Sequence, residues 1–432
     1  MSAEPVPEHA ASWYAASAND VTACPPLAGS VDADVCVIGA GYTGLSSAIC
    51  LAERGFRVVV LEARKVGFGA SGRNGGQMIG GISGEERIAR HSGPEYEDLL
   101  WELRWAGHDI IRARVAKYDI RCDLKAGYVD VAIKARHLRA LERAAETLAR
   151  RNFPHDFGLM SAAETRAALG TGAYIGALRN MANGHLHPLE LCIGEARAAA
   201  SLGAAIYEHS PVTSLESGGV GHGSKVTAHT PHGSVIADAV IIAGNAYQAF
   251  EPRLSRRFFP VRSYIIATAP LSAAQLETVN PRDYAVCDPN FVLEYFRLST
   301  DRRLLFGGRC NYFGKDSRRI ATELRPRMER IYPQLAGIAI DYAWGGTIAV
   351  TPRRTPQLGR LAPNLWYSQG YSGHGINVSH LAGELLAEAI AGSMERFDVL
   401  ARMKSAVIPG VTRFGRQMVS LGLLYYGLRD RL

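Results

Sequence analysis

Three glycines and one acid near the start of the chain have the types and spacing needed to bind a dinucleotide. They are Gly39, Gly41, Gly44 and, 18 residues further on, Glu62. The first glycine permits a tight turn, the second lets a pyrophosphate approach bare backbone, and the third lets a helix pack closely on a strand. The carboxylate would accept both hydroxyls of an adenosine ribose and repel a 2′-phosphate. The pattern therefore favours FAD or NAD over NADP.

The surrounding residues predict the strand, turn and helix that would position these four side chains. Residues 34–38 are an apolar strand, and apolar residues recur at helical spacing over 45–52 before Gly55 ends the helix. A second apolar strand then leads to Glu62. The phosphates of a dinucleotide would face the helix N-terminus. The alternative is an α/β unit of the same shape that binds no nucleotide.

Length and composition indicate two domains, without a membrane span or a nucleic-acid surface. The 432 residues exceed the size at which one core keeps growing, and 47% hydrophobic and 21% charged residues are ordinary for a globular protein. The formal charge of +7 comes without a lysine-rich block or interleaved aromatic residues, so nucleic acid is not an expected partner. The N-terminus resembles no secretory signal, and we expect a cytoplasmic protein.

Two further segments could bring bare backbone close to a cofactor. Residues 69–77 carry four glycines among small polar residues, and Arg73 could neutralise a phosphate or meet a substrate carboxylate. Residues 240–245 are an apolar strand that ends in small residues, including Ala243 and Gly244. Each segment alone is also compatible with a loop or strand that binds no ligand.

Residues 367–377 form another glycine-rich turn, and its composition has a catalytic reason. The segment ends a strand, turns on Gly370, Gly373 and Gly375, and starts a helix with an apolar face. A helix N-terminus aimed at the flavin pyrimidine edge would stabilise the negative charge that develops there on reduction. A nicotinamide becomes neutral on reduction and has no such need, so this turn favours FAD.

The order of the motifs resembles that of FAD-dependent amine and amino-acid oxidases of the D-amino-acid oxidase superfamily, with the gamma-glutamylputrescine oxidases as the most similar branch. The resemblance implies an α/β fold, α+β overall, in which a sheet-rich substrate domain is inserted discontinuously into a Rossmann-like FAD-binding domain. It is carried by residues 39–44, 70–76, 184–189, 243–244, 344–347 and 372–375.

The alternation of helical and strand-rich stretches along the sequence predicts an arm, two interleaved domains and a C-terminal segment. We expect Trp13 and Tyr14 to anchor the arm. The C-terminal segment is apolar with basic ends, so it could lie on an anionic membrane or pack on the domain surface. The expected ranges are 1–30 for the arm, 31–90, 158–250 and 345–400 for the FAD-binding domain, 91–157 and 251–344 for the substrate domain, and 401–432 for the C-terminal segment.

Residue by residue, the resemblance also implies a set of FAD contacts. Glu62 would bind the ribose, residues 71–77 would wrap the flavin side, the backbone of Val212 would meet adenine, and residues 346–347 and 373–375 would close over the isoalloxazine. The expected set is Gly39, Gly41, Tyr42, Thr43, Gly44, Glu62, Ala63, Arg64, Ser71, Gly72, Arg73, Asn74, Gly75, Gly76, Gln77, Val212, Ala243, Gly244, Gly346, Thr347, Gly373, His374, Gly375 and Ile376.

The attachment of the flavin is predicted from an absence of cysteine. Some relatives bind the flavin covalently through a cysteine just after the tryptophan-glycine segment, but residues 344–359 contain none. Non-covalent FAD is therefore expected, with Cys310 as the alternative attachment point. The seven cysteines are scattered, and His185 with His187 makes too small a group for a metal site, so no metal is expected.

The reaction implied is oxidation of gamma-glutamylputrescine or a similar gamma-glutamylated or aliphatic amine. A hydride would pass to flavin N5, the imine would hydrolyse to an aldehyde, and oxygen would reoxidise the flavin to give hydrogen peroxide. Tyr264, Trp344 and His374 are the expected catalytic-pocket residues, because aromatic walls attract an alkylammonium and exclude water. Tyr264 could instead be a core residue, and His374 could only shape the helix start.

Two other functions remain open at this stage. One is an FAD-dependent dehydrogenase of D-amino acids or N-methyl amino acids that passes electrons to a respiratory acceptor. The other is a flavin-binding protein without turnover. The expected partners of the leading hypothesis are the amine and molecular oxygen, and the expected assembly is a monomer or a small homo-oligomer.

Overall fold

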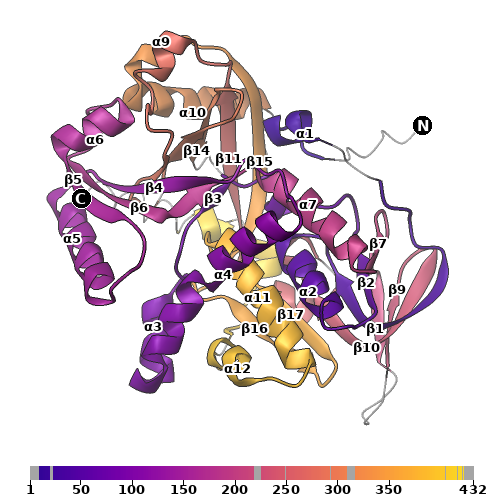
Figure 1. Cartoon of the computed structure of the whole chain (residues 1–432). Helices are drawn as coiled ribbons and strands as arrows, with labels where there is room; N and C mark the ends of the chain where they lie inside the picture. The colour runs from indigo at the N-terminus through magenta and orange to yellow at the C-terminus, as the bar shows by residue number, and fades with distance from the viewer. Residues whose placement is uncertain are drawn as a thin grey trace.

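Two β-sheets and a central group of helices make up the molecule (Figure 1). The structure is a computed structural model, and it describes residues 9–19, 23–217, 225–248, 250–291, 293–308, 317–403, 405–415, 417–420 and 422. In Figure 1, strands β1, β2, β7, β9 and β10 lie at the lower right, while β4, β6, β11, β14 and β15 lie in the upper half.

The first sheet is parallel from β17 to β7, and β16, β9 and β8 join it in antiparallel pairs. Its order is β16-β17-β10-β1-β2-β7, with β9 paired to β10 and β8 to β9. The central strands are buried on both faces, which explains why their sequences are uninterrupted apolar runs. The strands are β1 (Gly29–Ile38), β2 (Val58–Leu61), β7 (Ala205–Tyr207), β8 (Ser214–Ser217), β9 (Val226–His229), β10 (Gly233–Ile242), β16 (Gln357–Ala362) and β17 (Leu365–Gln369).

The second sheet is antiparallel except where β12 pairs with β4. Its order is β15-β11-β14-β13-β12-β4-β6-β3, with β5 paired to β6. One face packs on α10 through a cluster that includes Val129, Phe296 and Phe306, while the other face looks toward the first sheet. The strands are β3 (Gln77–Met78), β4 (Lys125–Ala132), β5 (Phe157–Ser161), β6 (Gly176–His185), β11 (Phe259–Thr268), β12 (Ala285–Cys287), β13 (Tyr295–Leu298), β14 (Leu304–Gly308) and β15 (Ile340–Val350).

Helices α2, α4, α7 and α11 pack on one another near the centre of the view in Figure 1 and bury the largest apolar cluster. The other helices lie around this group. The helices are α1 (Trp13–Ser17), α2 (Tyr42–Ala52), α3 (Glu85–Ser92), α4 (Glu97–Lys117), α5 (Ala135–Arg150), α6 (Ala162–Leu169), α7 (Pro188–Ser201), α8 (Pro252–Ser255), α9 (Ala273–Leu276), α10 (Ser317–Ile331), α11 (Gly375–Ile390) and α12 (Glu395–Ala401), with 3-10 turns η1 (Ala70–Gly72), η2 (Pro94–Tyr96), η3 (Asn245–Tyr247) and η4 (Pro333–Leu335).

The aromatic and apolar residues of 291–296 predict a strand over that whole segment, but β13 begins only at Tyr295. The carboxylate of Asp288 accepts the backbone N–H of Asn290 at 3.1 Å, which fixes a turn just before this segment. Strands β5 and β6 belong to the second sheet, although the sequence assigned residues 158–250 to the FAD-binding domain.

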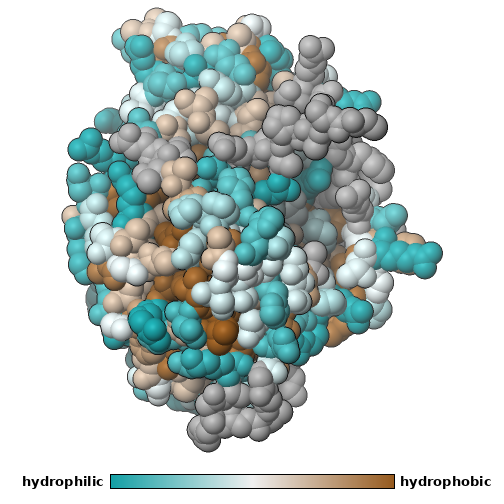
Figure 2. Space-filling model, turned by 90° about the vertical axis from the view of Figure 1, so that its right-hand side faces the viewer, coloured by the Kyte–Doolittle hydropathy of each residue, from teal (hydrophilic) through white to brown (hydrophobic). Residues whose placement is uncertain are grey.

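Residues near both limits of the described chain contact the second sheet. Trp13 and Tyr14 are buried, as expected, and the Trp13 indole donates to Asp301 at 3.1 Å. Near the other end, Val419 packs against Phe259 and Val261. Within the described ranges, no helix is long and apolar enough to cross a membrane. On the face shown in Figure 2, hydrophilic residues predominate at the periphery and hydrophobic ones gather left of centre.

Candidate active site

A single cavity of about 1340 Å³ reaches residues of both sheets. The glycine turn after β1 and the end of β2 line one part of it, and strands β4, β11 and β15 line another. Its volume exceeds the roughly 300–1,000 Å³ of an ordinary small-molecule site, so it has room for a dinucleotide together with a substrate.

The turn between β1 and α2 has the close packing that its glycines predict. Gly39 adopts φ +105°, a conformation that side chains other than glycine rarely take. A Cβ on Gly44 would lie 1.8 Å from the backbone oxygen of Gly39. This contact seats the start of α2 directly against the turn. The first residues of the helix, Tyr42 and Thr43, line the cavity, and a helix N-terminus favours an anion.

Glu62 follows β2 and is held by backbone groups on both sides. Its carboxylate accepts N–H groups from Ala40 at 2.8 Å and from Arg64 at 2.9 Å. Burial raises the pKa of Glu62, while these two N–H groups oppose the rise. The acid lines the cavity, so a ribose hydroxyl placed there would meet a carboxylate whose orientation is already fixed.

The loop from 70 to 77 is folded by its own polar side chains. Asn74 donates to the carbonyl of Ser71 at 2.7 Å and accepts the N–H of Gly76 at 2.8 Å. The Ser71 hydroxyl accepts the N–H of Tyr42 at 3.0 Å, which ties the loop to the start of α2. The Trp344 indole donates to the Arg73 carbonyl at 3.1 Å and fixes the loop from the other sheet.

Arg73 is a cation in a restricted, largely apolar setting. Its guanidinium lies 4.7 Å from the Phe68 ring centroid and 5.9 Å from that of Tyr247, and it donates to the Phe68 carbonyl. Burial lowers the pKa of Arg73. Because the charge is set in the cavity wall, an anionic group of a bound ligand is its natural counterpart.

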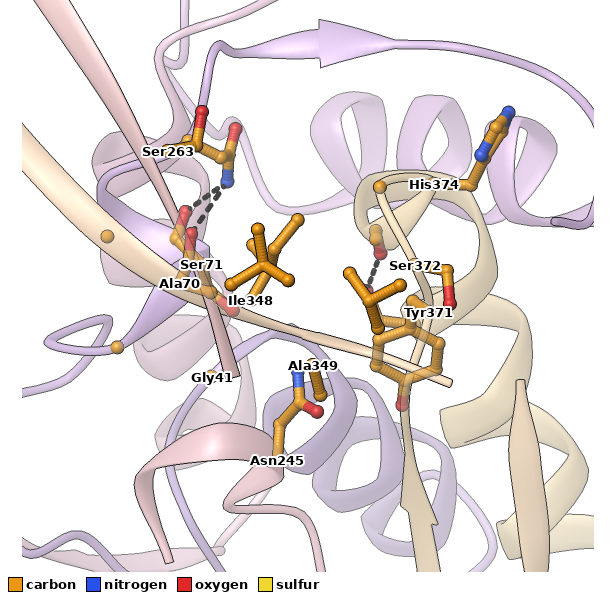
Figure 3. A pocket seen from close by; sticks show the side chains of 18 of the residues that line it. Gly41, Ala70, Ser71, Asn245, Ser263, Ile348, Ala349, Tyr371, Ser372 and His374 are labelled. Atoms are coloured by element: carbon orange, nitrogen blue, oxygen red, sulfur yellow. Dashed lines mark hydrogen bonds between the residues drawn. The ribbon is translucent and has the colours of Figure 1, made fainter. Parts of the chain in front are cut away.

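The start of α11 closes another side of the cavity. In Figure 3, Tyr371, Ser372 and His374 surround the same space as Ile348. Cβ atoms on Gly373 and Gly375 would meet no protein atom within 4 Å. Protein packing therefore does not explain the glycine at position 375, and space for a ligand against this helix start does.

His374 is neutral in its surroundings. Burial lowers the pKa of His374 to about 4, helped by the charges of Arg354 and Arg104. Its Nδ1 is buried and has no hydrogen-bond partner among the described residues. The imidazole therefore offers an uncharged polar atom beside the cavity rather than a cation.

Most of the predicted FAD contacts line this one cavity, and their role as contacts remains a prediction. The exceptions are Gly44, Gly72, Gly76 and Thr347. Cβ atoms on Gly72 and Gly76 would lie 2.2 Å from the carbonyls of Gly67 and Leu186, so both glycines serve loop packing. The members that line it are Gly39, Gly41, Tyr42, Thr43, Glu62, Ala63, Arg64, Ser71, Arg73, Asn74, Gly75, Gln77, Val212, Ala243, Gly244, Gly346, Gly373, His374, Gly375 and Ile376.

Two of the three expected catalytic residues do not line the cavity. Tyr264 is 3% exposed and packs in the cluster beneath α10, because side chains alternate along β11 and its neighbours Ser263 and Ile265 take the cavity face. Trp344 packs on Tyr14, with ring centroids 5.2 Å apart. Of the three, only His374 lines the cavity.

The sequence also missed cavity residues on strands and turns far apart in the chain. They are Tyr128 and Asp130 on β4, Arg104 on α4, and Arg353 and Arg354 in the turn after β15. The alternation of polar and apolar residues along 128–131 could have indicated that β4 presents Tyr128 and Asp130 to one face. Nothing in the residues that flank the arginines predicts that they line a cavity.

A buried ionic cluster lies behind the helix starts. Glu195 of α7 contacts Arg114 of α4 at 2.8 Å and lies 3.1 Å from Nε2 of His380 on α11. Burial raises the pKa of Glu195, but His380 and Arg114 outweigh it and the net pKa is lowered. The His380 ring also lies 4.9 Å from that of Tyr42 in the first turn of α2, so the cluster joins all four central helices.

His185 and His187 have structural partners. His185 contacts the Asp283 carbonyl at 2.9 Å, and the ring of His187 accepts the Glu190 N–H at the start of α7. No group of three or more His, Cys, Asp or Glu residues suited to a metal ion occurs in the part of the chain that the structure describes. Cys310, the alternative flavin attachment point, lies outside the described residues.

The sequence matches curated proteins over nearly its full length. The chain is 42% identical to the gamma-glutamylputrescine oxidoreductase of Escherichia coli over 428 residues, covering 98% of this chain and 99% of that protein. It is 39% identical to the probable oxidoreductase OrdL of Haemophilus influenzae, covering 98% of each.

Solved structures share the fold at lower identity. The glycine oxidase of Geobacillus kaustophilus superposes with a TM-score of 0.67 at 21% identity, covering 87% of this chain and 96% of that one. The L-amino acid deaminase of Proteus myxofaciens gives a TM-score of 0.69 at 19% identity, covering 89% of this chain and 96% of that one. These matches confirm the expected Rossmann-like fold.

The family assignment rests on the length of the profile match. The profile of the FAD dependent oxidoreductases, the family of D-amino-acid oxidase, matches residues 34–389. That range includes the glycine turn, the loop from 70 to 77 and the start of α11. The protein is an enzyme that uses FAD to oxidise an amine or an amino acid, and the chain belongs to the FAD-dependent oxidoreductase family of D-amino-acid oxidase.

Proposed function

We propose that this enzyme oxidises the terminal amine of a gamma-glutamylated aliphatic amine, gamma-glutamylputrescine or a close analogue. The observation that carries the proposal is the charge of the cavity wall. Arginines outnumber acids there, so the cavity attracts a substrate that bears a carboxylate as well as an amine. The arginines are Arg64, Arg73, Arg87, Arg104, Arg262, Arg353 and Arg354, and the acids are Glu62 and Asp130.

The name of the 42% identical relative supports the same substrate class. A gamma-glutamyl group carries a free carboxylate, and a bidentate guanidinium contact is the usual way to bind one. Putrescine alone has two cationic ends and would be repelled by the same arginines. The proposal therefore expects conjugated amines to be better substrates than free diamines.

The protein's own groups prepare the amine for oxidation. FAD, when bound, accepts the hydride that leaves the carbon beside the amine, and water hydrolyses the resulting imine to an aldehyde. Ile265, Ile348 and Ala349 give the cavity an apolar wall that excludes water. His374 stays uncharged and the nearby arginines disfavour an ammonium, so the site favours the neutral amine, whose lone pair assists hydride departure.

An anaerobic screen tests the substrate assignment. Purified holoenzyme should lose its yellow absorbance with gamma-glutamylputrescine at least tenfold faster than with putrescine or with D- and N-methyl amino acids. Bleaching by amino acids alone would replace the proposal by an amino-acid dehydrogenase. Bleaching by no amine at all would favour a flavin-binding protein without turnover.

Oxygen as the acceptor, the cytoplasm as the location and a monomer or small homo-oligomer as the assembly also belong to this proposal. Oxygen uptake with stoichiometric hydrogen peroxide release would support an oxidase. Reoxidation only by a quinone or dye would assign a dehydrogenase.

The proposal includes FAD bound without a covalent link. The described residues that line the cavity include one cysteine, Cys287, and burial raises the pKa of its thiol. A thiol held in its neutral form is a poor nucleophile for attack on a flavin ring. Acid precipitation should therefore leave the yellow colour in the supernatant. Colour in the pellet would contradict this part of the proposal.

A further inference from the structure

Asp130 is an acid in a cavity otherwise rich in arginine. It lies on β4, where the alternation of side chains puts Tyr128 and Asp130 on the cavity face and Val129 and Val131 in the apolar cluster beneath α10. In the sheet it pairs with Cys287 on β12, which also lines the cavity. Its partial exposure is therefore toward the cavity, in the interior of the protein.

The carboxylate of Asp130 is only partly satisfied by the protein. The Tyr128 hydroxyl donates to one oxygen, Oδ1, at 3.1 Å. Among the described residues, no donor within hydrogen-bond distance is found for the other oxygen, and no basic side chain lies within 4 Å of either. An acid in the interior is costly unless a cation or further donors meet it, so a ligand cation is the missing counterpart.

Asp130 and His374, which stands at the start of α11, both line the cavity and both lie within the electrostatic reach of Arg104. The charge of Arg104 acts on both groups: it lowers the pKa of Asp130 and that of His374. Arg104 is itself paired with Glu85 at 2.9 Å, so its charge is shared with another acid. Burial raises the pKa of Asp130 to about 6, against the effects of Tyr128 and Arg104, and the acid is still mostly ionised at pH 7.

We propose that Asp130 is a specificity-determining residue that binds a second cationic nitrogen of the substrate, the α-ammonium of an amino-acid head group, at a distance from the amine that is oxidised. This inference rests on the proposed function and deepens it. A substrate with a carboxylate alone would satisfy the arginines and leave Asp130 unpaired. A substrate with both charges of an α-amino acid would satisfy arginines and Asp130 together.

The test uses two ligands that cannot be oxidised at a terminal amine, so that binding is measured apart from turnover. One is γ-glutamyl-n-butylamide, and the other is glutaric acid mono-n-butylamide, which differs by the missing α-amino group. Calorimetry with the holoenzyme should show the first binding about ten- to a hundredfold more tightly, the effect of one charged hydrogen bond. Asp130→Asn should abolish that ratio by weakening the first ligand and not the second.

Asp238→Asn is the matched control, because Asp238 is an exposed aspartate on β10 and the substitution removes the same charge. This control should keep the parent ratio. Equal affinity of the two ligands for the parent enzyme would overturn the inference, and so would a ratio that Asp130→Asn leaves intact. Turnover of gamma-glutamylputrescine, measured separately, decides the proposed function: a head-group preference without turnover would reject the reaction and keep the Asp130 site.

Discussion

Different kinds of chemical group line the two ends of the cavity. At the end where we propose that the nucleotide binds, called the nucleotide end, glycines and backbone N–H groups line the cavity, and two N–H groups orient Glu62. At the other end, side chains from β4, β11, β15 and α11 meet across long sequence separations, and their charges are arginines opposed by Asp130. The first end presents fixed main-chain geometry, and the second presents a pattern of charge and apolar surface.

This difference indicates a division of labour between cofactor and substrate. A cofactor is the same molecule in every turnover, and a rigid backbone cradle binds it without needing to adapt. A substrate is recognised by its charges and its length, which side chains can change one at a time. Substitutions at the nucleotide end should therefore affect FAD content, while substitutions at the other end should affect substrate choice in an enzyme that keeps its FAD.

The largest effect that tests this difference between the two ends is expected from a methyl group at Gly44. Gly44→Ala should yield protein with little or no FAD, because the Cβ would lie 1.8 Å from the Gly39 carbonyl and backbone must move. We expect a loss of stability of about 3 kcal/mol or more. FAD per chain after desalting is the measurement. Gly172→Ala is the control, since a Cβ there meets no atom within 4 Å, and FAD retained in both variants would contradict the rigid-cradle account.

A smaller effect on FAD binding is expected from a substitution of Glu62, the acid at the nucleotide end. Glu62→Gln keeps the size of the side chain but removes its charge, and an amide cannot accept from Ala40 and Arg64 through both ends of the group. The FAD dissociation constant should rise about tenfold to a hundredfold, because charged hydrogen bonds of about 1.5–3 kcal/mol are weakened. Fluorescence titration of the apoprotein with FAD measures it. An unchanged affinity would show that the ribose is not bound at Glu62.

The pH dependence of flavin reduction tests the role of His374 at the substrate end. Its pKa is lowered to about 4, below the usual 6.5, so it is neutral throughout pH 6 to 9 and cannot give rise to a titration there. The rate of anaerobic flavin reduction should rise across this range as the substrate ammonium loses its proton. His374→Gln should keep the same midpoint, with a rate changed by less than about tenfold. A midpoint near pH 6 that disappears in the variant would assign a titrating role to His374.

The smallest effect is expected at Tyr264, which the sequence placed in the pocket. Its hydroxyl is buried and has no hydrogen-bond partner among the described residues, so Tyr264→Phe should change stability and flavin reduction very little. Ser263→Leu, one residue earlier on β11, should slow flavin reduction because it fills space on the cavity face. Stopped-flow reduction rates compare the two. The reverse result would mean that Tyr264, and not Ser263, faces the cavity.

The sequence could predict a nucleotide site at this end of the cavity because the signals for it are local. Gly39, Gly44 and Glu62 fall within one strand-turn-helix-strand unit, where spacing alone fixes their neighbours. Tyr264 lies outside the cavity because a shift of one residue along a strand moves a side chain to the opposite face. Nothing within residues 259–268 says which face meets a cavity formed with residues more than 80 positions away.

Asp130 and Arg354 could not be predicted as cavity residues either, because their positions depend on contacts between distant segments. Each is an ordinary charged residue in its own segment, and only the pairing of β12 with β4 and the turn after β15 bring them to one cavity. Strand existence was predictable from apolar periodicity, but strand order was not, because β12 and β4 are separated by about 155 residues.

The pairing of β1 with β10 has a consequence for synthesis. Residues 29–38 pair with residues 233–242, so the central strand of the first sheet has β2 as a neighbour soon after translation but lacks its other partner for some 200 residues. At the usual 5–20 residues per second, the apolar edge of β1 stays uncovered on the ribosome for roughly 10–40 s. An exposed strand edge of this kind is prone to aggregate. Yield in a heterologous host should therefore depend on chaperone capacity and slower translation rather than on a supply of flavin, since the cradle for FAD cannot close before β10 emerges.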